Sequence, residues 1–577
     1  MNNNESVLLE NCLEKKSEID GEAKISGSEN IDNDCLRSSD SKVCENNNPN
    51  MMFTKLVCKQ SEKHVFSHHA GILLYSFFLA GLPPVILFAK QLLISVLLGA
   101  LNIEQSKLLN FSSLKNMFFK FSKTLNSQRY LLGEYSKTDN HMKDLFRYNS
   151  SIVNARNISD FYYDPHSKPY RGFQNILKGW CGNLGRPEKL INMDFIHTCF
   201  GDPVWLSHHD SFYDLRERFL KNITEFRSTL CIPENQELTM VVDRGIYKLE
   251  LFDEIINSCN NKIITWEKGY KKGQWDENKI EGKFIMTKYR NNSRDMLFYK
   301  FEYMSMDWSK NNKMNQIIVK ATNPKGRTIE LSIITNEKAR AVEEIIRLMF
   351  KRWLQENDFK YLKKHFGIDE ITSYDTIPYS SLKGLIEDKL VKSGEIKSIN
   401  KDKNKLEKEL KKLLLSENQS KNKNKKRENK ILVLTEQLSK LKTKIKNVSE
   451  KESKLDALIR DETIKLKTNK KALMDVIKII ARNIFYKSIE QFKILYDNYR
   501  DDHVMFRNFI DADGFILYGE EIVDVILCPT AQYPPNKRYI FEKFLGNINK
   551  ANPIMPDGSN RIIQFKLADD RNNEIAI

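Results

Sequence analysis

Apolar and polar residues change their pattern several times along this chain of 577 residues, and each change predicts a different kind of element. Leucine and phenylalanine recur at helical spacing within residues 61–150, which predicts a helical N-terminal domain. Short runs rich in β-branched and aromatic residues follow within 151–243, separated by polar turns, and predict the strands of a sheet. Similar runs return between about 262 and 334, separated by Asn, Gly and Lys, so we expect an inserted antiparallel β region there.

The clearest change in composition lies within residues 396–470, where lysine and glutamate dominate and glycine is absent. Apolar residues there keep a spacing of three and four from Leu434 to Ile459, which is typical of the seam of a coiled coil. A shorter seam over 406–413 precedes it, and a polar, basic break separates the two seams. We therefore expect a coiled-coil hairpin of antiparallel helices, with a dimerising coil as the alternative.

The two ends of the chain give weaker patterns. Residues 1–60 are polar and rich in Asn, Ser, Glu and Asp, which predicts a disordered tail. Residues 471–577 predict a helical stretch followed by a small β region, to which we assign only packing or the binding of DNA ends.

An uncharged run of 19 residues, Gly71–Ala89, is long enough to approach a membrane span. Pro83 and Pro84 interrupt this run, and proline breaks the hydrogen-bond ladder of a helix. We therefore expect two buried helices of the N-terminal domain here and no membrane partner, with a transmembrane segment as the alternative.

The chain carries a formal charge of +16, which favours a polyanionic partner such as nucleic acid. Its nine cysteines are scattered and include no CxxC pair, so neither a zinc module nor a disulfide framework is indicated. They are typical of reduced thiols in a cytosol. Four histidines lack a partner at the spacing of a zinc site, so we expect them to be structural or to face DNA: His166, His197, His208 and His209.

Two aspartates stand at the ends of apolar runs. Asp164 follows ISDFYY and precedes a proline, and Asp243 follows ELTMVV and precedes Arg-Gly. Each run predicts a short strand that is stopped by turn residues. Acids at the carboxyl ends of strands lie at the sheet edge where α/β folds bind ligands. A loop acid or a helix cap is the alternative for each of them.

The stretch Phe350–Lys363 predicts a helix with a charged face, and we expect this helix to end at Gly367. Arg352, Glu356 and Lys363 stand at offsets of zero, four and eleven, which at about 100° per residue return to within roughly 40° of one another. A carboxylate beside two cations suits a metal ion held next to a phosphate, because the acid binds the metal and the basic groups bind the oxyanion. The alternative is a charged surface face.

The order Asp164, Asp243, Glu356 and the R-x3-E-x6-K helix resemble the DDE transposases of bacterial insertion sequences, in particular the subgroup with a Y-x2-R-x3-E-x6-K helix. The segments YYDPHSKPYRG, LKGW, DFIHTCFGDP and HHDSFYDLRERF are similar to the region around the first aspartate of that family. The resemblance covers roughly residues 65–375. It departs from the family at the signature tyrosine, where this chain has Met349, so the aromatic hydroxyl that the family would use for one DNA contact is missing while the three acids are kept.

The resemblance implies an α/β fold with a ribonuclease H-like catalytic core over residues 151–375, and this core contains the β insertion. The helical N-terminal domain, residues 61–150, would precede the core and help to bind the transposon ends, and the C-terminal coiled-coil and helical region would follow the core. The implied activity is that of a DNA transposase, which cleaves phosphodiester bonds at transposon ends and transfers the freed 3′-hydroxyl strand to target DNA. Its partners would be the terminal inverted repeats and the target DNA, bound by a homodimer in the cytoplasm at the nucleoid.

The resemblance also implies roles for the site residues. Asp164, Asp243 and Glu356 would be catalytic and would hold two divalent metal ions, Mg²⁺ or Mn²⁺, while Arg352 and Lys363 would bind backbone phosphate. Two such ions activate the attacking oxygen and stabilise the leaving oxygen. The alternatives are a related Mg²⁺-dependent nuclease, a catalytically degenerate or domesticated copy that binds DNA without cutting it, and a membrane-tethered coiled-coil protein.

Overall fold

The computed structural model describes residues 63–568 apart from short gaps, together with three strands outside that range. The gaps are 119–123, 183, 211–212, 259, 290–295, 383–389, 416–420, 449–450, 498–500 and 530–533. The outer strands are β1 (Ser41–Glu45), β2 (Lys55–Lys59) and β21 (Glu574–Ala576). Most of the tail 1–60 that we expected to be disordered lies outside the described residues, but β1 and β2 within it pair as antiparallel strands.

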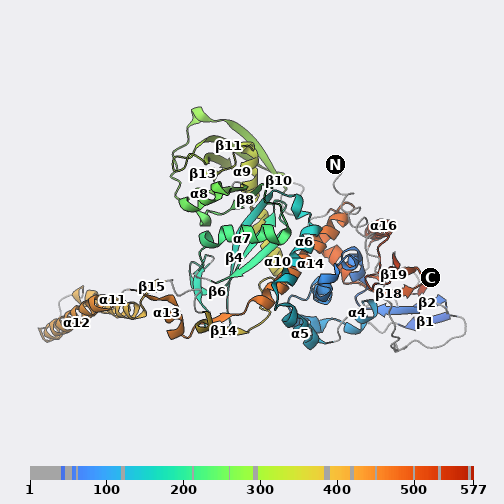
Figure 1. Cartoon of the computed structure of the whole chain (residues 1–577), viewed down its shortest axis with the longest axis horizontal. Coiled ribbons are helices and arrows are strands. Elements are labelled where there is room, and N and C mark those ends of the chain that lie inside the picture. Colours follow the sequence, from blue (N-terminus) through green and yellow to red (C-terminus); the bar gives the residue numbers. More distant parts are fainter. Residues whose placement is uncertain are drawn as a thin grey trace.

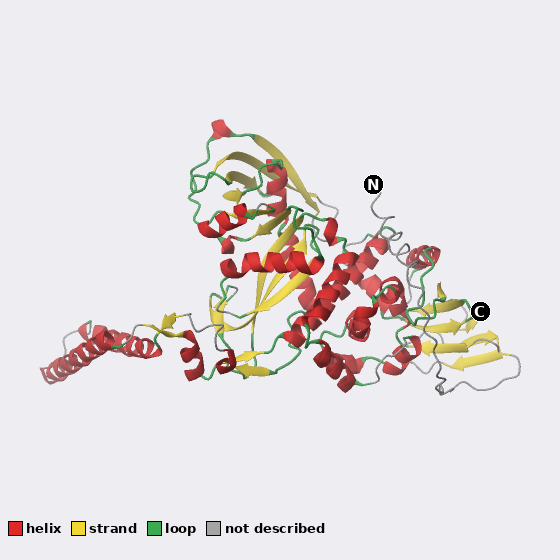
Figure 2. Cartoon of the chain, in the orientation of Figure 1, coloured by secondary structure: helices red, strands yellow, loops and turns green. Residues whose placement is uncertain are grey.

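Helices and sheets are mixed throughout the molecule, so the expected α/β class is confirmed (Figures 1 and 2). The largest sheet has ten strands, and the order β7-β6-β4-β8-β9 forms its central part. β6 is antiparallel to β4 and to β7, whereas β8 is parallel to β4 and β9 is parallel to β8. The bounds of these strands are β4 (Asp160–Pro169), β6 (Arg186–Thr198), β7 (Pro203–His209), β8 (Leu238–Val242) and β9 (Asn261–Trp266).

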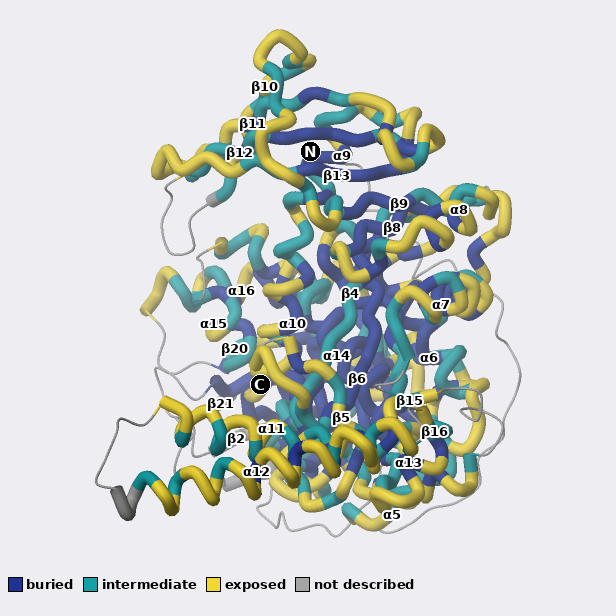
Figure 3. Tube along the Cα trace, turned by 90° about the vertical axis from the view of Figure 1, so that its left-hand side faces the viewer, coloured by how far each residue is buried: buried dark blue, intermediate teal, exposed yellow. Residues whose placement is uncertain are grey.

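The composition of the central strands explains their position. All residues of β8, LTMVV, are buried, as expected for a parallel strand that is covered on both faces (Figure 3). Helices α7 (Leu215–Leu230) and α8 (Leu249–Asn257) connect β7 to β8 and β8 to β9. Phe219 of α7 and Phe252 of α8 are buried in the main core, so the two crossover helices help to cover the sheet. The short strand β5 (Lys178–Cys181) pairs with the beginning of β6.

Four antiparallel strands extend the sheet beyond β9. In order from β9 they are β13 (Thr328–Thr335), β12 (Asn315–Thr322), β11 (Met296–Asp307) and β10 (Gly282–Tyr289). The antiparallel strands expected within 262–334 are therefore present, but β9 in the same stretch belongs to the parallel part of the sheet. Helix α9 (Val342–Lys351) covers the extension, since its Ile345 and Met349 lie in one apolar cluster with Ile317.

The stretches 61–150 and 471–577, which we expected to be separate regions, share one hydrophobic core. The long helix α14 (Asn469–Lys493) lies in this core and contacts two helices of the N-terminal stretch, α3 (Lys90–Leu97) and α6 (Asp139–Ile152). A four-stranded sheet also joins the two stretches, because β3 is antiparallel to β18. The other elements are β3 (Lys63–Ser67), α2 (Ser76–Ala80), α4 (Phe111–Met117), α5 (Leu125–Tyr135), α15 (Asp501–Ile510), β18 (Asp513–Tyr518), β19 (Ile522–Cys528), α16 (Pro535–Lys550) and β20 (Ile562–Leu567).

The uncharged run Gly71–Ala89 lies largely inside this shared core. It forms the short helix α2 and two 3₁₀ helices, Ala70–Tyr75 and Pro84–Ala89, where we expected two longer helices. The difference follows from the two prolines, which stop the helical hydrogen-bond ladder in the middle of the run. Among the helices of the described residues, none is both long and apolar enough to cross a membrane.

Residues 390–453 form an arm that projects from the rest of the molecule (Figures 1 and 2). Its helices α11 and α12 lie side by side along the arm. Two small antiparallel ladders close its base, β15 with β16 and β14 with β17. The bounds are β14 (Thr376–Pro378), β15 (Leu390–Lys392), α11 (Gly394–Leu414), α12 (Lys421–Asn447), β16 (Lys451–Ser453) and β17 (Ile464–Leu466).

We expected the apolar seam to continue to Ile459. This prediction is wrong beyond the end of α12. Leu434 and Leu438 are buried on α12, as expected. Leu455 belongs instead to the separate short helix α13 (Lys454–Arg460), where it packs in a different apolar cluster. The seam is interrupted because the chain after α12 pairs as β16 with β15 before it becomes helical again.

Candidate active site

Asp164 and Asp243 lie at neighbouring positions of two adjacent parallel strands. Tyr163 of β4 is in register with Val242 of β8, and each aspartate follows directly. Adjacent strands are about 4.8 Å apart, so the two acids leave the sheet side by side. Asp243 is the first residue after β8 and precedes a 3₁₀ turn, which is the strand end that we predicted. Asp164 differs from the prediction, because β4 continues to Pro169 in its pairing with β6.

Glu356 lies in the first turn of α10 (Trp353–Phe366), and this turn rests on β4. The side-chain amide of Gln355 donates to the carbonyl oxygen of Tyr162 at 3.4 Å, two residues before Asp164 on the strand. The same amide donates to Nδ1 of His197 at 2.8 Å, so the start of α10 is tied to β6 as well. Glu356 follows Gln355 directly, and its side chain is 51% exposed.

The pKa of Asp164 depends on the two other acids, Asp243 and Glu356. Burial raises the pKa of its carboxyl to about 7, and Arg352 and His166 oppose this rise. The charges of Asp243 and Glu356 raise the same pKa further, so both carboxylates lie within electrostatic reach of Asp164. The structure therefore brings Asp243 and Glu356, which lie far apart in the sequence, within electrostatic reach of Asp164.

Arg352 lies between two of these acids. Its Nη1 is 3.7 Å from Oδ1 of Asp164, and its Nη2 is 2.9 Å from Oε1 of Glu356. The predicted single helix is broken at this residue, because α9 ends at Lys351 and α10 begins at Trp353. The guanidinium thus partly neutralises the acids at the junction of the two helices.

The donor set of the site suits a hard divalent cation, because Mg²⁺ and Mn²⁺ prefer carboxylate oxygens. Burial is the main cause of the raised pKa of Asp164, and the charges of Asp243 and Glu356 add to it, so a bound cation would favour the ionised carboxylate. Within the described part of the chain, no three Asp, Glu, His or Cys side chains are already close enough together to hold a metal ion. The carboxylates would therefore have to move toward one another, and away from Arg352, for a metal ion to bind.

Lys363 lies at the far end of the same face of α10 and is 67% exposed. Its Nζ is 3.3 Å from Oδ2 of Asp369, whose other oxygen lies 2.9 Å from Nε2 of His166. Burial opposes ionisation of Asp369, but the His166 hydrogen bond and the nearby lysines hold its pKa well below its usual range. Asp164 and His166 are two residues apart on β4 and therefore share one face of the strand, so a row of polar groups leads from the acids to Lys363. The sequence patterns did not indicate Asp369, and they predicted His166 only as a structural or DNA-facing residue.

Met349 stands where the family signature has tyrosine, and the structure places it in the core. It is 1% exposed and packs in the apolar cluster between α9 and the extended sheet. Because this position is buried, the methionine makes apolar contacts where the family's tyrosine would place its hydroxyl.

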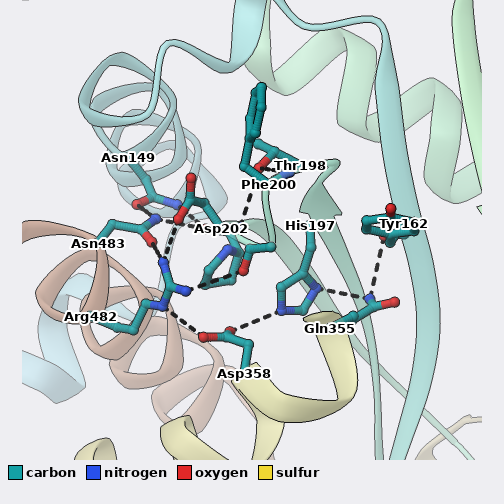
Figure 4. Close-up of polar contacts among 12 residues, drawn as sticks. Asn149, Tyr162, His197, Thr198, Phe200, Asp202, Gln355, Asp358, Arg482 and Asn483 are labelled. Carbon is teal, nitrogen blue, oxygen red and sulfur yellow. Dashed lines mark hydrogen bonds and ion pairs between the residues drawn. The ribbon is translucent and has the colours of Figure 1, made fainter. Parts of the chain in front are cut away.

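A buried polar network holds α10 through Asp358, which contacts His197 of β6 and Arg482 of α14 (Figure 4). Nε2 of His197 is 3.1 Å from Oδ2 of Asp358, and Nε of Arg482 is 2.7 Å from Oδ1 of the same aspartate. Nη1 of Arg482 also donates to Oδ1 of Asp202 at 2.6 Å. His197 and Asp358 are almost completely buried, and burial lowers the pKa of His197. The expectation that this histidine is structural agrees with these contacts.

Arg482 belongs to a row of charged residues on α14 that also holds the end of α10. Lys478 donates from Nζ to the carbonyl oxygen of Gly367, and Lys471 donates to that of Ile368 at 2.8 Å. Between them, Asp475 accepts from Lys471 and lies 3.1 Å from Nε2 of His208. Cations at the carboxyl end of a helix are favoured by its dipole.

The sequence itself carries a signal for this row of charged residues. The residues at 471, 475, 478 and 482 follow helical spacing and are charged, while the residues around them are apolar. A helix that is apolar on its other faces is buried, so a charged row on it must meet buried partners.

Comparison with known proteins places the chain among transposases. A family model described as "Transposase protein" matches residues 217–568, a range that includes Asp243, Glu356 and α14 and begins after Asp164. No curated protein matches the chain. A solved structure, the cryo-EM structure of a piggyBac transposase synaptic complex with hairpin DNA, is similar at 10% sequence identity and a TM-score of 0.27. The similarity covers 51% of this chain and 59% of that chain. Because the family model spans more than half of its length, the chain belongs to a family of transposases.

Proposed function

We propose that this transposase is of the DDE type and uses Asp164, Asp243 and Glu356 as its catalytic acids. It would cleave phosphodiester bonds at the ends of a transposon and transfer the freed 3′-hydroxyl strand to target DNA. One observation carries the proposal: two of these acids follow a matched pair of residues on parallel strands, and the third is near enough to raise the pKa of Asp164.

The order of the central strands supports a ribonuclease H-like core. In the sheet, β6 lies between β4 and β7 and is antiparallel to both, and β8 and β9 then join parallel to β4 on its other side. The end of β8 lies beside β4, so Asp164 and Asp243 would belong to one site. Helix α10, the second helix after the β extension, would contribute Glu356 to the same site.

The acids provide ligands of the type that Mg²⁺ or Mn²⁺ requires. Two bound divalent ions would supply an activated attacking oxygen and a stabilised leaving oxygen during phosphodiester cleavage. Asp164 and Asp243, fixed on the sheet, would hold the ions, and the more exposed Glu356 would complete the site from α10.

Arg352 and Lys363 suit the phosphates near the cut. A guanidinium binds phosphate oxygens through two parallel hydrogen bonds, so Arg352 can exchange its carboxylate partners for DNA when the acids bind metal. Lys363 is exposed at the other end of the face and supplies a single positive charge. The two residues would therefore position the strand along α10.

The test uses labelled duplexes that carry the inverted repeats flanking the coding sequence, with Mg²⁺ or Mn²⁺. Asp164→Asn, Asp243→Asn and Glu356→Gln should each reduce strand cleavage at least about 1,000-fold, because each removes a charged ligand from the site. DNA binding should stay measurable in all three. Glu250→Gln on the exposed start of α8 is the matched control and should cleave normally. If the three variants cut as fast as the wild type, the site assignment fails.

The same assay separates the alternatives. A degenerate or domesticated copy would bind the inverted repeats and leave them intact. A related nuclease would cut the strand but give no joined product with target DNA. A strand-transfer product in the wild type, absent from the Asp164→Asn reaction, supports the proposed activity over both.

A further inference from the structure

The arm over residues 390–453 contributes to neither the catalytic site nor the main core. Within its described residues, the exposed side chains outnumber the buried ones on both α11 and α12 (Figure 3). Its base is held by the β15–β16 ladder and by Glu452, which accepts from the backbone nitrogen of Gly394 and pairs with Arg460 at 2.6 Å. A long, anchored projection with so little buried surface is suited to contact with a partner.

The positive charge of the protein is concentrated on this arm. Residues 390–453 contain 19 lysines and arginines and 9 acids, a net charge of +10 out of +16 for the whole chain. The other 513 residues carry 73 cations and 67 acids and are therefore close to balance. A basic composition spread over the whole surface would not produce this difference.

The cations of α12 lie in rows beside the apolar seam. Lys426, Lys440 and Lys444 fall within about 40° of one another at 100° per residue, and Lys442 and Lys446 lie on the other flank. The ion pairs that join described cations of α12 to acids are Lys430 with Glu409 and Lys440 with Glu436. Most of the positive charge on the described part of α12 is thus free to meet a partner.

We infer that the arm binds the sugar-phosphate backbone of duplex DNA, outside the active site and without reading sequence. The inference rests on the proposed function, which supplies DNA as the partner. Double-stranded DNA carries one negative charge per about 1.7 Å of its axis, so it complements a row of lysines along a helix. A helix of the length of α12 spans about 40 Å, or roughly twelve base pairs. Such contacts fix the position of the protein on DNA and leave sequence recognition to other surfaces.

The test measures binding of the full chain to a labelled duplex of arbitrary sequence between about 50 and 200 mM salt. In the arm variant, Lys440, Lys442, Lys444 and Lys446 are all changed to Gln, which keeps helix propensity close to that of lysine. Each lost phosphate contact lowers the slope of log affinity against log salt by about 0.9, so the slope should fall by about 2 to 4. The affinity at the lower salt concentration should fall about 10- to 1,000-fold.

The matched control removes the same charge from exposed lysines outside the arm, by changing Lys107, Lys221, Lys248 and Lys550 to Gln. It should lose less than about threefold in affinity. A second arm variant, in which a short Gly-Ser linker replaces residues 394–447 between the paired strands β15 and β16, should show the same loss as the arm variant. Agreement between the two arm variants excludes misfolding of α12 as the cause.

Several results would overturn the inference. If both four-lysine variants bind DNA as the wild type does, the arm proposal fails while the proposed function stands. If the wild type itself binds no duplex, the proposed function fails too. If the arm variant binds DNA normally but loses self-association in sedimentation velocity, the arm is an interface between copies of the chain and does not bind DNA.

Discussion

Nε of Arg482 and Oδ1 of Asp358 lie 2.7 Å apart in the interior, and this ion pair joins the C-terminal part of the chain to the helix of Glu356. Burial of two charges costs several kcal/mol, which only well-placed partners offset. Here Asp202 and His197 complete the set of partners (Figure 4). Apolar residues would join two helices at a lower cost in desolvation free energy. We therefore infer that the role of the charged pair is to fix the orientation of α10 against the sheet.

Replacement of Arg482 by methionine tests this relationship. Arg482→Met leaves Asp358 and Asp202 buried without their cation, and should lower the free energy of unfolding by about 3–5 kcal/mol. Urea unfolding at neutral pH measures the loss. Arg186→Met is the control, because Arg186 forms an exposed pair with Glu188 and its loss should cost less than about 1 kcal/mol. Equal losses in the two variants would contradict a special role for the buried pair.

The raised pKa of Asp164 predicts a stability that depends on pH. The folded state holds this proton up to about pH 7, whereas the unfolded chain releases it near the ordinary value of 3.8. Between these two values the folded state binds more protons, so ionisation of Asp164 destabilises the fold increasingly as pH rises. Asp164→Asn removes this effect and should be more stable than the wild type by up to about 4 kcal/mol at pH 8.

The gain from Asp164→Asn should shrink toward zero as pH falls to about 4, where the wild-type carboxyl is neutral in both states. Thermal or urea unfolding in the presence of a metal chelator measures the difference at each pH. A gain that is equal at pH 4 and pH 8 would show that the asparagine acts by packing and that Asp164 is not a destabilising charge.

The candidate site was predictable from sequence because its signals are local. The runs before Asp164 and Asp243 are rich in residues that favour strands, and turn chemistry ends the strand at Asp243, whereas β4 continues past Asp164 to Pro169. The charged face of α10 and its end at Gly367 also depend on short spacings, and the structure has this glycine at φ +58. The break at Arg352 was missed because the periodicity of α9 and α10 is continuous across it.

The contacts between distant parts of the chain could not be predicted in this way. β3 near the N-terminus pairs with β18 near the C-terminus, and no local pattern specifies such a partner. The ion pair of Arg482 with Asp358 likewise joins residues 124 positions apart. Each half of such a contact looks like an ordinary strand or a charged helix position, so only the folded chain shows their relationship.

Gly367 is also required sterically, and this gives a further prediction. Its φ of +58 favours glycine, and a Cβ added there would lie 2.5 Å from the backbone oxygen of Leu101. Gly367→Ala should therefore lower the free energy of unfolding by about 2–4 kcal/mol. This is more than the roughly 1 kcal/mol expected from left-handed backbone strain alone. The control is Gly326→Ala, at a turn with φ +77 and open space around the added Cβ, which should cost only the strain. Urea unfolding of both variants measures the difference, and similar costs would mean that α10 can shift away from Leu101.

Arg352 affects the binding of a metal ion to the acids, because it lies 3.7 Å from Asp164 and 2.9 Å from Glu356. Arg352→Gln removes one positive charge from the site, which strengthens the attraction for any cation. The electrostatic free energy of binding improves about twice as much for a divalent ion as for the proton that the ion displaces from Asp164, because it scales with charge. The affinity for the metal ion should therefore rise. We expect Mn²⁺ to bind about 3- to 30-fold more tightly in the absence of DNA, measured by calorimetry or electron paramagnetic resonance at pH 8.

Lys363→Gln is the matched control for this experiment, since Lys363 pairs with Asp369 at the far end of the same face. It should leave Mn²⁺ affinity within about twofold and should weaken DNA binding. Arg352→Gln should bind the metal more tightly and still cleave DNA more slowly, because the phosphate loses its bidentate partner. Weaker Mn²⁺ binding in Arg352→Gln would show instead that the arginine holds the carboxylates in their binding geometry, and its role would then be structural.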